Sequence, residues 1–182
     1  EEQQEFMSPR PTQSQPPATD LRETVTAPDV QAVREIVAST GFFYDHEIAV
    51  AVELAQEALD KGAEASGYHF LFMDDAGARG RAIAYACFGP IACTVGSWDL
   101  YWIAAHSDRR GKGLGRNLLR ASEERIRAMG GRRVYIETSS RPLYEPTRGF
   151  YLACGYAEEA RLAEFYGPGD DKIIYSRALA EG

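Results

Sequence analysis

Apolar and polar positions along the chain follow two periods, one helical and one extended. Val30, Val33, Ile36 and Val37 recur at helical spacing after Pro28, a residue that the first turn of a helix tolerates. The same period predicts further helices over 41–62, 113–129 and 145–154. Apolar alternation or short apolar runs predict strands over 21–25, 68–73, 81–88, 97–105, 132–140, 156–165 and 172–179.

The order of these elements, β-α-α-β-β-β-α-β-α-β-β, predicts an α+β domain. The strand over 132–140 follows a strand–helix unit, so it should lie parallel to the strand over 97–105. Turn residues at 74–80 and 167–171 predict hairpins on either side of this pair. We therefore expect a mixed, mostly antiparallel sheet of about six to seven strands flanked by helices.

Composition narrows the class of protein. Hydrophobic residues make up 45% of the 182 positions and charged residues 26%, which is ordinary for one soluble globular domain. We place this domain at 21–182. The net charge of −7 argues against general binding to nucleic acid or to anionic membranes. Any cationic site must therefore be local.

The N-terminal segment and the cysteines suggest a cytoplasmic protein. Residues 1–20 are rich in Gln and Pro, so we expect a disordered tail without a secretory signal. Met7 is a candidate native start, which would make residues 1–6 an addition to the natural chain. Cys87, Cys93 and Cys154 lack any CxxC spacing, which indicates reduced thiols, and the three histidines add no metal-ligand spacing.

The local cationic site is the segment RRGKGLGR, residues 109–116. Glycines allow a ligand to approach the backbone N–H groups, and the helix that follows adds partial positive charge at its N-terminus. Arg109, Arg110, Lys112 and Arg116 surround this loop in an otherwise acidic chain. Such a loop suits a phosphate or pyrophosphate group.

Three interpretations of the loop can be weighed from its residues alone. A Walker loop is excluded because Lys112 is followed by Gly113 rather than by Ser or Thr. A dinucleotide-binding loop stays open: Gly111, Gly113 and Gly115 give GxGxG rather than GxGxxG, but Glu137 follows about 20 residues later. A solvated loop that eases the start of a helix is the third interpretation.

Two segments carry a resemblance to a known family. Residues 110–115, Arg-Gly-Lys-Gly-Leu-Gly, fit the pattern (Gln/Arg)-x-x-Gly-x-(Gly/Ala), and FYLACGY at 150–156 places Tyr151 shortly before Gly155 and Tyr156. At this spacing the two segments resemble the motifs of the GNAT superfamily of acyl-CoA-dependent N-acyltransferases, as does the predicted strand order. The resemblance covers about residues 21–179. It implies acetyl-CoA as co-substrate and no metal.

The resemblance also implies where coenzyme A would lie. Its pantetheine arm would enter a gap where the parallel strands Trp98–Ala105 and Arg133–Thr138 splay apart, commonly helped by a bulge. Backbone groups of Ile103, Ala104 and Ala105 would bond the pantetheine and the thioester oxygen. The remaining residues expected to bind coenzyme A are Arg109, Arg110, Gly111, Lys112, Gly113, Leu114, Gly115, Arg116 and Thr138.

In such enzymes the acceptor amine attacks the thioester directly, so a base and an acid are needed. Asp99 is the first candidate for the base and Glu137 the second. Asp99 could equally be a solvent-facing strand residue, and Glu137 could pair with Arg148. Tyr151 occupies the position whose phenol would protonate the leaving thiolate, although a helical tyrosine in an apolar segment is by default a core aromatic. His106 is interpreted as a surface histidine.

The acceptor pocket would be built by the first two helices and the last hairpin turn. Tyr44 and Tyr166 are the residues expected to contact the acceptor. Their acidic neighbours Asp45, Glu47, Asp170 and Asp171 would favour a cationic amine, unless they only reflect ordinary loop polarity. Whether the acceptor is a small amine, an amino acid, an antibiotic or a protein lysine stays open.

An alternative function uses the same fold without catalysis. The chain could hold acyl-CoA as a sensor or scaffold, but the tyrosine at position 151 favours the enzyme. A homodimer is left open, and neither nucleic acid nor membrane is expected as a partner.

Overall fold

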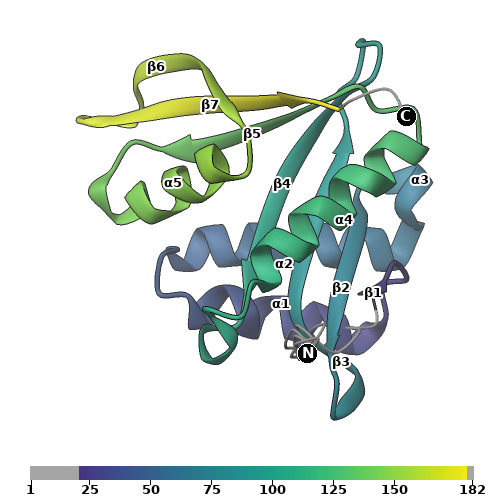
Figure 1. Ribbon diagram of the computed structural model, residues 1–182. Helices are drawn as coiled ribbons and strands as arrows, with labels where there is room; N and C mark the ends of the chain where they lie inside the picture. The colour runs from purple at the N-terminus through teal and green to yellow at the C-terminus, as the bar shows by residue number, and fades with distance from the viewer. Residues whose placement is uncertain (1–20, 180–182) are drawn as a thin grey trace, which may run out of the picture.

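A seven-stranded sheet in the order β1-β2-β3-β4-β5-β7-β6 organises the computed structural model, which describes residues 21–179 (Figure 1). The expected tail over 1–20 lies outside the described residues. The strands are β1 (Leu21–Arg22), β2 (His69–Asp75), β3 (Ala78–Pro90), β4 (Ser97–Ala105), β5 (Arg133–Ser139), β6 (Ala157–Gly167) and β7 (Asp170–Ala178). The helices are α1 (Ala27–Ser39), α2 (Asp45–Lys61), α3 (Ala63–Ser66), α4 (Leu114–Ala128) and α5 (Glu145–Ala153), with 3-10 turns η1 (Ser107–Arg109) and η2 (Pro142–Tyr144).

Helices cover both faces of the sheet (Figure 1). On one face, Val33 and Val37 of α1 pack in a buried cluster with Phe70, Phe72 and Tyr85 of β2 and β3. On the other face α4 contributes Leu118, Leu119 and Ile126 to a second buried cluster. Strand residues of the same cluster include Leu71, Phe88 and Leu100. The mixed, mostly antiparallel α+β fold expected from the sequence is confirmed.

The parallel pair β4–β5 stays together for only three register positions. Ser97, Trp98 and Asp99 pair with residues 133–135, and beyond this point the ladder ends. β5 pairs with β7 over its whole length, from Arg133 to Ser139, and Figure 1 shows β5, β7 and β6 turning away from β4. The sequence prediction of a splayed parallel pair is therefore confirmed, and the sheet opens on one side.

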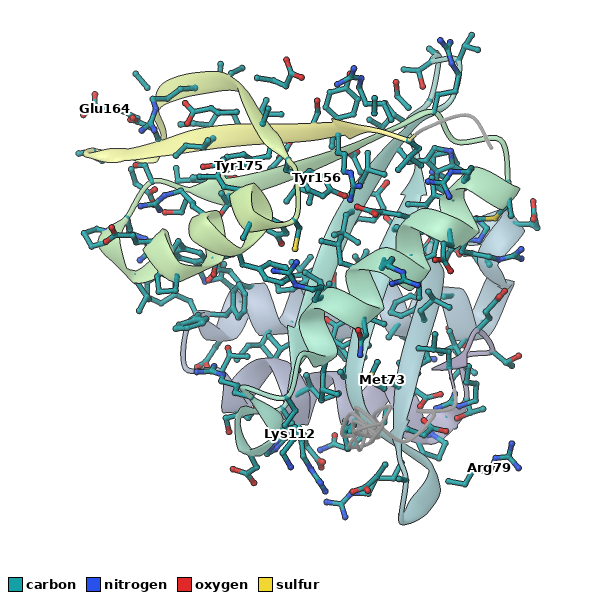
Figure 2. All side chains as sticks on the ribbon, in the orientation of Figure 1. Met73, Arg79, Lys112, Tyr156, Glu164 and Tyr175 are labelled. Carbon is teal, nitrogen blue, oxygen red and sulfur yellow. The ribbon has the colours of Figure 1, made fainter. Side chains whose placement is uncertain are left out.

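A buried ionic contact holds the two halves of the opened sheet together. Glu123 of α4 is buried and accepts hydrogen bonds from Tyr156 Oη at 2.9 Å and from Arg177 Nη1 at 3.0 Å. Tyr156 lies where α5 leads into β6 (Figure 2), and Arg177 belongs to β7. Because α4 also packs on β3 and β4, Glu123 links this part of the sheet to β7.

Several element boundaries differ from the sequence prediction, and hydrogen bonds explain two of them. The first strand was expected over 21–25 but contains only Leu21 and Arg22, because the Arg22 guanidinium bonds Asp29 and Asp74 and the chain turns at once into α1. The second helix was expected from residue 41 but begins at Asp45. Tyr44 is its N-cap with extended backbone, and its N–H donates to Glu47 Oε2 at 2.8 Å.

Candidate active site

A cleft of about 1510 Å³ occupies the opening between β4 and β5. Its walls come from β4, from the loop and first turn of α4, from the end of β5 and from α5. The start of α2 and the β6–β7 turn complete the outer end. One concave site therefore joins most of the residues that the sequence analysis singled out.

Strand β4 presents an open edge to the cleft. Its register against β3 shifts because Tyr101 is an extra residue between the pairs Leu100–Phe88 and Trp102–Cys87, so the expected bulge is present. Ile103, Ala104 and Ala105 follow this bulge and line the cleft. Within the described residues this part of β4 has no partner in β5, so its backbone groups can bond a ligand.

The glycine-rich loop that contains Gly111 and Gly113 lines the cleft with backbone that no side chain covers. Gly111 and Gly113 have φ of 75° and 73°, a left-handed conformation that side chains with a Cβ rarely adopt. No atom lies within 4 Å of a Cβ built at either position. Gly113 is also the N-cap of α4, so the loop ends at the positive pole of a helix. This combination forms a site for an anion such as pyrophosphate.

Two of the expected cationic residues anchor the loop. Arg109 pairs with Asp75 at the β2–β3 hairpin. Arg110 donates to the Thr40 carbonyl at 3.0 Å, and its guanidinium lies 5.0 Å from the centroid of the Phe42 ring. Both side chains line the cleft while they fasten the loop to β2 and to the end of α1.

Of the five other residues expected to bind coenzyme A, four line the cleft and one does not. Leu114, Gly115 and Arg116 line the cleft, as does Thr138 at the end of β5, whose side chain is buried. Lys112 is exposed at the tip of the loop and does not line the cleft (Figure 2). Its expected contact with coenzyme A stays a prediction.

Asp99 lies at the point where the two strands separate. Its pKa is raised from an ordinary value of 3.8 to about 6, chiefly by burial and also by the nearby Glu137, while Lys172 acts to lower it. Glu137 also lines the cleft, and its carboxylate pairs with Lys172 Nζ at 2.6 Å. The alternative pairing of Glu137 with Arg148 is wrong, because Arg148 donates to the carbonyls of Ser139 and Arg141.

Tyr151 is both a core aromatic and a cleft residue. It is 6% exposed and packs against Phe150, Tyr156 and Tyr175, with ring centroids 5.4–6.3 Å apart. It also lines the cleft, and burial raises the pKa of its phenol well above the ordinary range. The hydroxyl therefore stays protonated at every physiological pH.

His106 does not line the cleft, and its Nδ1 accepts from the Asp108 N–H at 3.3 Å.

The outer end of the cleft is less acidic than the sequence suggested. Tyr44, Tyr166, Glu47 and Asp170 line it, but Asp45 and Asp171 do not. Asp171 accepts from the Glu164 N–H and from Arg161 instead, which draws it toward the β6–β7 hairpin.

Arg141 and Lys172 are residues of this site that the sequence analysis missed. Arg141 lines the cleft and its Nε lies 3.3 Å from Asp170 Oδ2. Lys172 lies 4.0 Å from the centroid of the Phe165 ring as well as beside Glu137. Each forms an ion pair with a carboxylate about 30 positions away in the sequence, so no local sequence pattern could have indicated it.

The described residues contain neither a group of metal ligands nor a membrane-spanning helix. Within residues 21–179, no three His, Cys, Asp or Glu side chains are grouped to hold a metal ion. No helix in that range is long and apolar enough to cross a membrane.

Comparison with known proteins gives a consistent result. The sequence profile of the acetyltransferase (GNAT) family matches residues 30–156. A crystal structure of a GNAT-family protein from Desulfovibrio desulfuricans is 45% identical, with a TM-score of 0.85, over 90% of this chain and 100% of that chain. No curated protein matches the chain.

More distant structures share the fold. An aminoglycoside 6'-N-acetyltransferase complexed with coenzyme A is 15% identical, with a TM-score of 0.69, over 90% of this chain and 98% of that chain. The ribosomal-protein-S18-alanine N-acetyltransferase from Escherichia coli is 16% identical, with a TM-score of 0.67, over 90% of this chain and 96% of that chain.

Proposed function

The chain belongs to the acetyltransferase (GNAT) family, and from this premise we propose that it transfers an acetyl group from acetyl-CoA directly to a primary amine. The observation that carries the proposal is the single cleft that joins an anion-binding loop, an open strand edge, a half-buried carboxylate and a buried tyrosine. Each of these is a part that direct acyl transfer needs.

The loop and β4 would hold acetyl-CoA. The N–H groups of residues 110–115 and the N-terminus of α4 fit its pyrophosphate, since Gly111 and Gly113 leave the backbone open. The free edge of Ile103–Ala105 fits the amide groups of the pantetheine arm and the thioester carbonyl. Acetyl-CoA supplies the acyl group as a thioester, which an amine can attack without a protein nucleophile.

Asp99 is the group that would take the proton of the amine. An alkylamine of pKa about 10.4 is protonated at pH 7 and must be deprotonated before it reacts. Deprotonation at pH 7 costs about 4.6 kcal/mol. A carboxylate of pKa about 6 is largely ionised at pH 7, yet it is a stronger base than an ordinary aspartate. One proton passes from the ammonium nitrogen to Asp99, directly or through water, before the nitrogen attacks the carbonyl carbon, because an ammonium has no free lone pair. The second proton leaves the nitrogen to solvent as the tetrahedral intermediate collapses to the amide.

Tyr151 would assist the departing sulfur. As the carbon–sulfur bond breaks, the phenol hydroxyl donates its hydrogen bond, and then its proton, to the thiolate, and solvent restores the hydroxyl. Burial raises the pKa of the phenol, so full proton transfer is uphill. The contribution of Tyr151 therefore belongs at the low end of general acid catalysis.

A coenzyme A release assay with a panel of primary amines tests the proposed function. We expect release that depends on the amine and matches the acetylated amine found by mass spectrometry. A protein that binds acetyl-CoA tightly but releases no coenzyme A with any amine would instead be a sensor or scaffold.

A further inference from the structure

Arg141 crosses the outer end of the cleft, between the end of β5 and the start of η2. Its Nη1 donates to Tyr44 Oη at 3.0 Å, and its Nε lies 3.3 Å from Asp170 Oδ2 and 3.4 Å from Ser139 Oγ. These contacts join the start of α2 to the start of β7 and hold the side chain across the cleft wall.

Aromatic rings fix the plane of the same guanidinium. Its central carbon lies 5.5 Å from the centroid of the Tyr44 ring and 5.3 Å from that of Tyr144. A guanidinium has five N–H donors in a rigid fork. Among the described residues, the contacts of Arg141 with Tyr44, Asp170 and Ser139 use Nε and one N–H of Nη1, and the Tyr144 hydroxyl also bonds the guanidinium. At least two of the five N–H groups are left, and the side chain is 29% exposed. Donors therefore remain for a ligand in the cleft.

Charges of both signs line this end of the cleft. Asp99 and Glu137 stand where the strands diverge. Farther out, Arg141 stands beside Asp170, and Glu47 also lines the wall. Glu137 and Arg141 are four positions apart, which bounds the distance between their Cα atoms at roughly 13 Å for extended chain. A ligand with an amine at one end and a carboxylate at the other could place the amine beside Asp99 and the carboxylate on the remaining donors of Arg141.

We propose that the acceptor amine also carries a carboxylate, and that Arg141 is the residue that binds this carboxylate. This assignment rests on the proposed acetyl transfer and names its substrate class: amino acids and related amino carboxylates. The planar fork of arginine matches the two oxygens of a carboxylate, and the ring contacts hold it in place before the ligand arrives.

Matched pairs of amines that differ only by the carboxylate test the proposal. Lysine is compared with 1,5-diaminopentane, and 4-aminobutyrate with propylamine. We expect the wild-type protein to show kcat/KM about 10- to 100-fold higher for the carboxylate member of at least one pair, as hydrogen bonds to a charged group predict. In Arg141→Gln this ratio should fall to about one through a higher KM, and Arg141→Lys should keep part of it.

The controls separate this role from a structural one. Arg120→Gln, which removes an exposed arginine of α4 paired with Glu124, should leave the ratio unchanged. If Arg141→Gln lowers kcat/KM equally for both amines of each pair, Arg141 only holds the cleft wall and the proposal is wrong. If wild type acetylates both members equally well, the proposal fails while acetyl transfer stands. If neither member is acetylated by a protein that binds acetyl-CoA, the proposed function and this proposal fail together.

Discussion

Asp99 of β4 and Tyr135 of β5 form the last pair of the parallel ladder between these strands. The carboxylate therefore stands at the apex of the opening, half-buried by the strands that have just separated. Burial at this apex, more than any single neighbour, raises the pKa of Asp99. The same divergence that frees the edge of β4 thus also prepares a base.

The charges beside Asp99 should tune the pH dependence of activity in opposite directions. Glu137 raises the pKa of Asp99 and Lys172 lowers it. Glu137→Gln should move the acid limb of the kcat/KM profile to lower pH, and Lys172→Met should move it to higher pH. Profiles of the two variants between pH 5 and 8 provide the check. Shifts in the same direction would contradict this arrangement.

Asp99→Asn should stabilise the folded protein at neutral pH. The pKa of Asp99 is raised on folding, from 3.8 to about 6, so its contribution to stability is present below 3.8 and is lost as pH rises through 6. The variant should gain about 1 kcal/mol above pH 7, less than the full shift implies because the side chain is half-exposed, and nothing near pH 4. Urea unfolding at both pH values measures the difference; equal gains at both would show that charge is not the cause.

Gly113→Val should weaken coenzyme A binding. Valine is strained at a φ of 73°, and adapting the loop would misdirect its N–H groups. Calorimetry should show a loss of at least about tenfold in affinity. Gly62→Val is the matched control, because Gly62 has a φ of 80°, open space around it and a place outside the cleft. Equal affinity in folded Gly113→Val and wild type would remove the loop from the pyrophosphate site.

Tyr151→Phe should lower turnover while it preserves the core. The ring contacts with Tyr156 and Tyr175 need no hydroxyl, so stability should change little. Loss of the acid should reduce kcat by about 10²-fold, the low end for general acid catalysis, with coenzyme A affinity nearly unchanged. Tyr175→Phe is the control, since Tyr175 is equally buried but does not line the cleft. Full turnover in Tyr151→Phe would leave this residue as a core aromatic.

The sequence predicted the parts of the site whose signals are local. The apolar run of β4, the alternate glycines and the amphipathic α4 stand next to one another in the chain, so their spacing alone located the loop and the strand beside it. Asp99 and Tyr151 followed from the same neighbourhood and from the resemblance. The parallel order of β4 and β5 followed from the strand–helix–strand unit, whereas their splay followed only from the resemblance to the GNAT family.

The electrostatic partners could not be predicted, because they come from distant positions. Arg109 lines the cleft as expected for a ligand-binding residue, and it also pairs with Asp75, 34 positions away. Lys172 reaches Glu137 only because β7 inserts beside β5 in the sheet. Arg141 meets Tyr44 across 97 positions, at the point where α2 and η2 come together. Such pairs depend on the packed fold, which no sequence period encodes.

The pH dependence of acetyl transfer by Asp99→Asn tests the central claim most directly. The measurement is kcat/KM for one accepted amine between pH 5 and 8, in wild type, in Asp99→Asn and in the exposed control Asp60→Asn. We predict that wild type and Asp60→Asn share an acid limb near pH 6, which reflects the raised pKa of Asp99. Asp99→Asn should lose about 10²-fold in rate together with that limb. An unchanged rate and an unchanged limb in Asp99→Asn would show that the carboxylate at the strand separation is not the base.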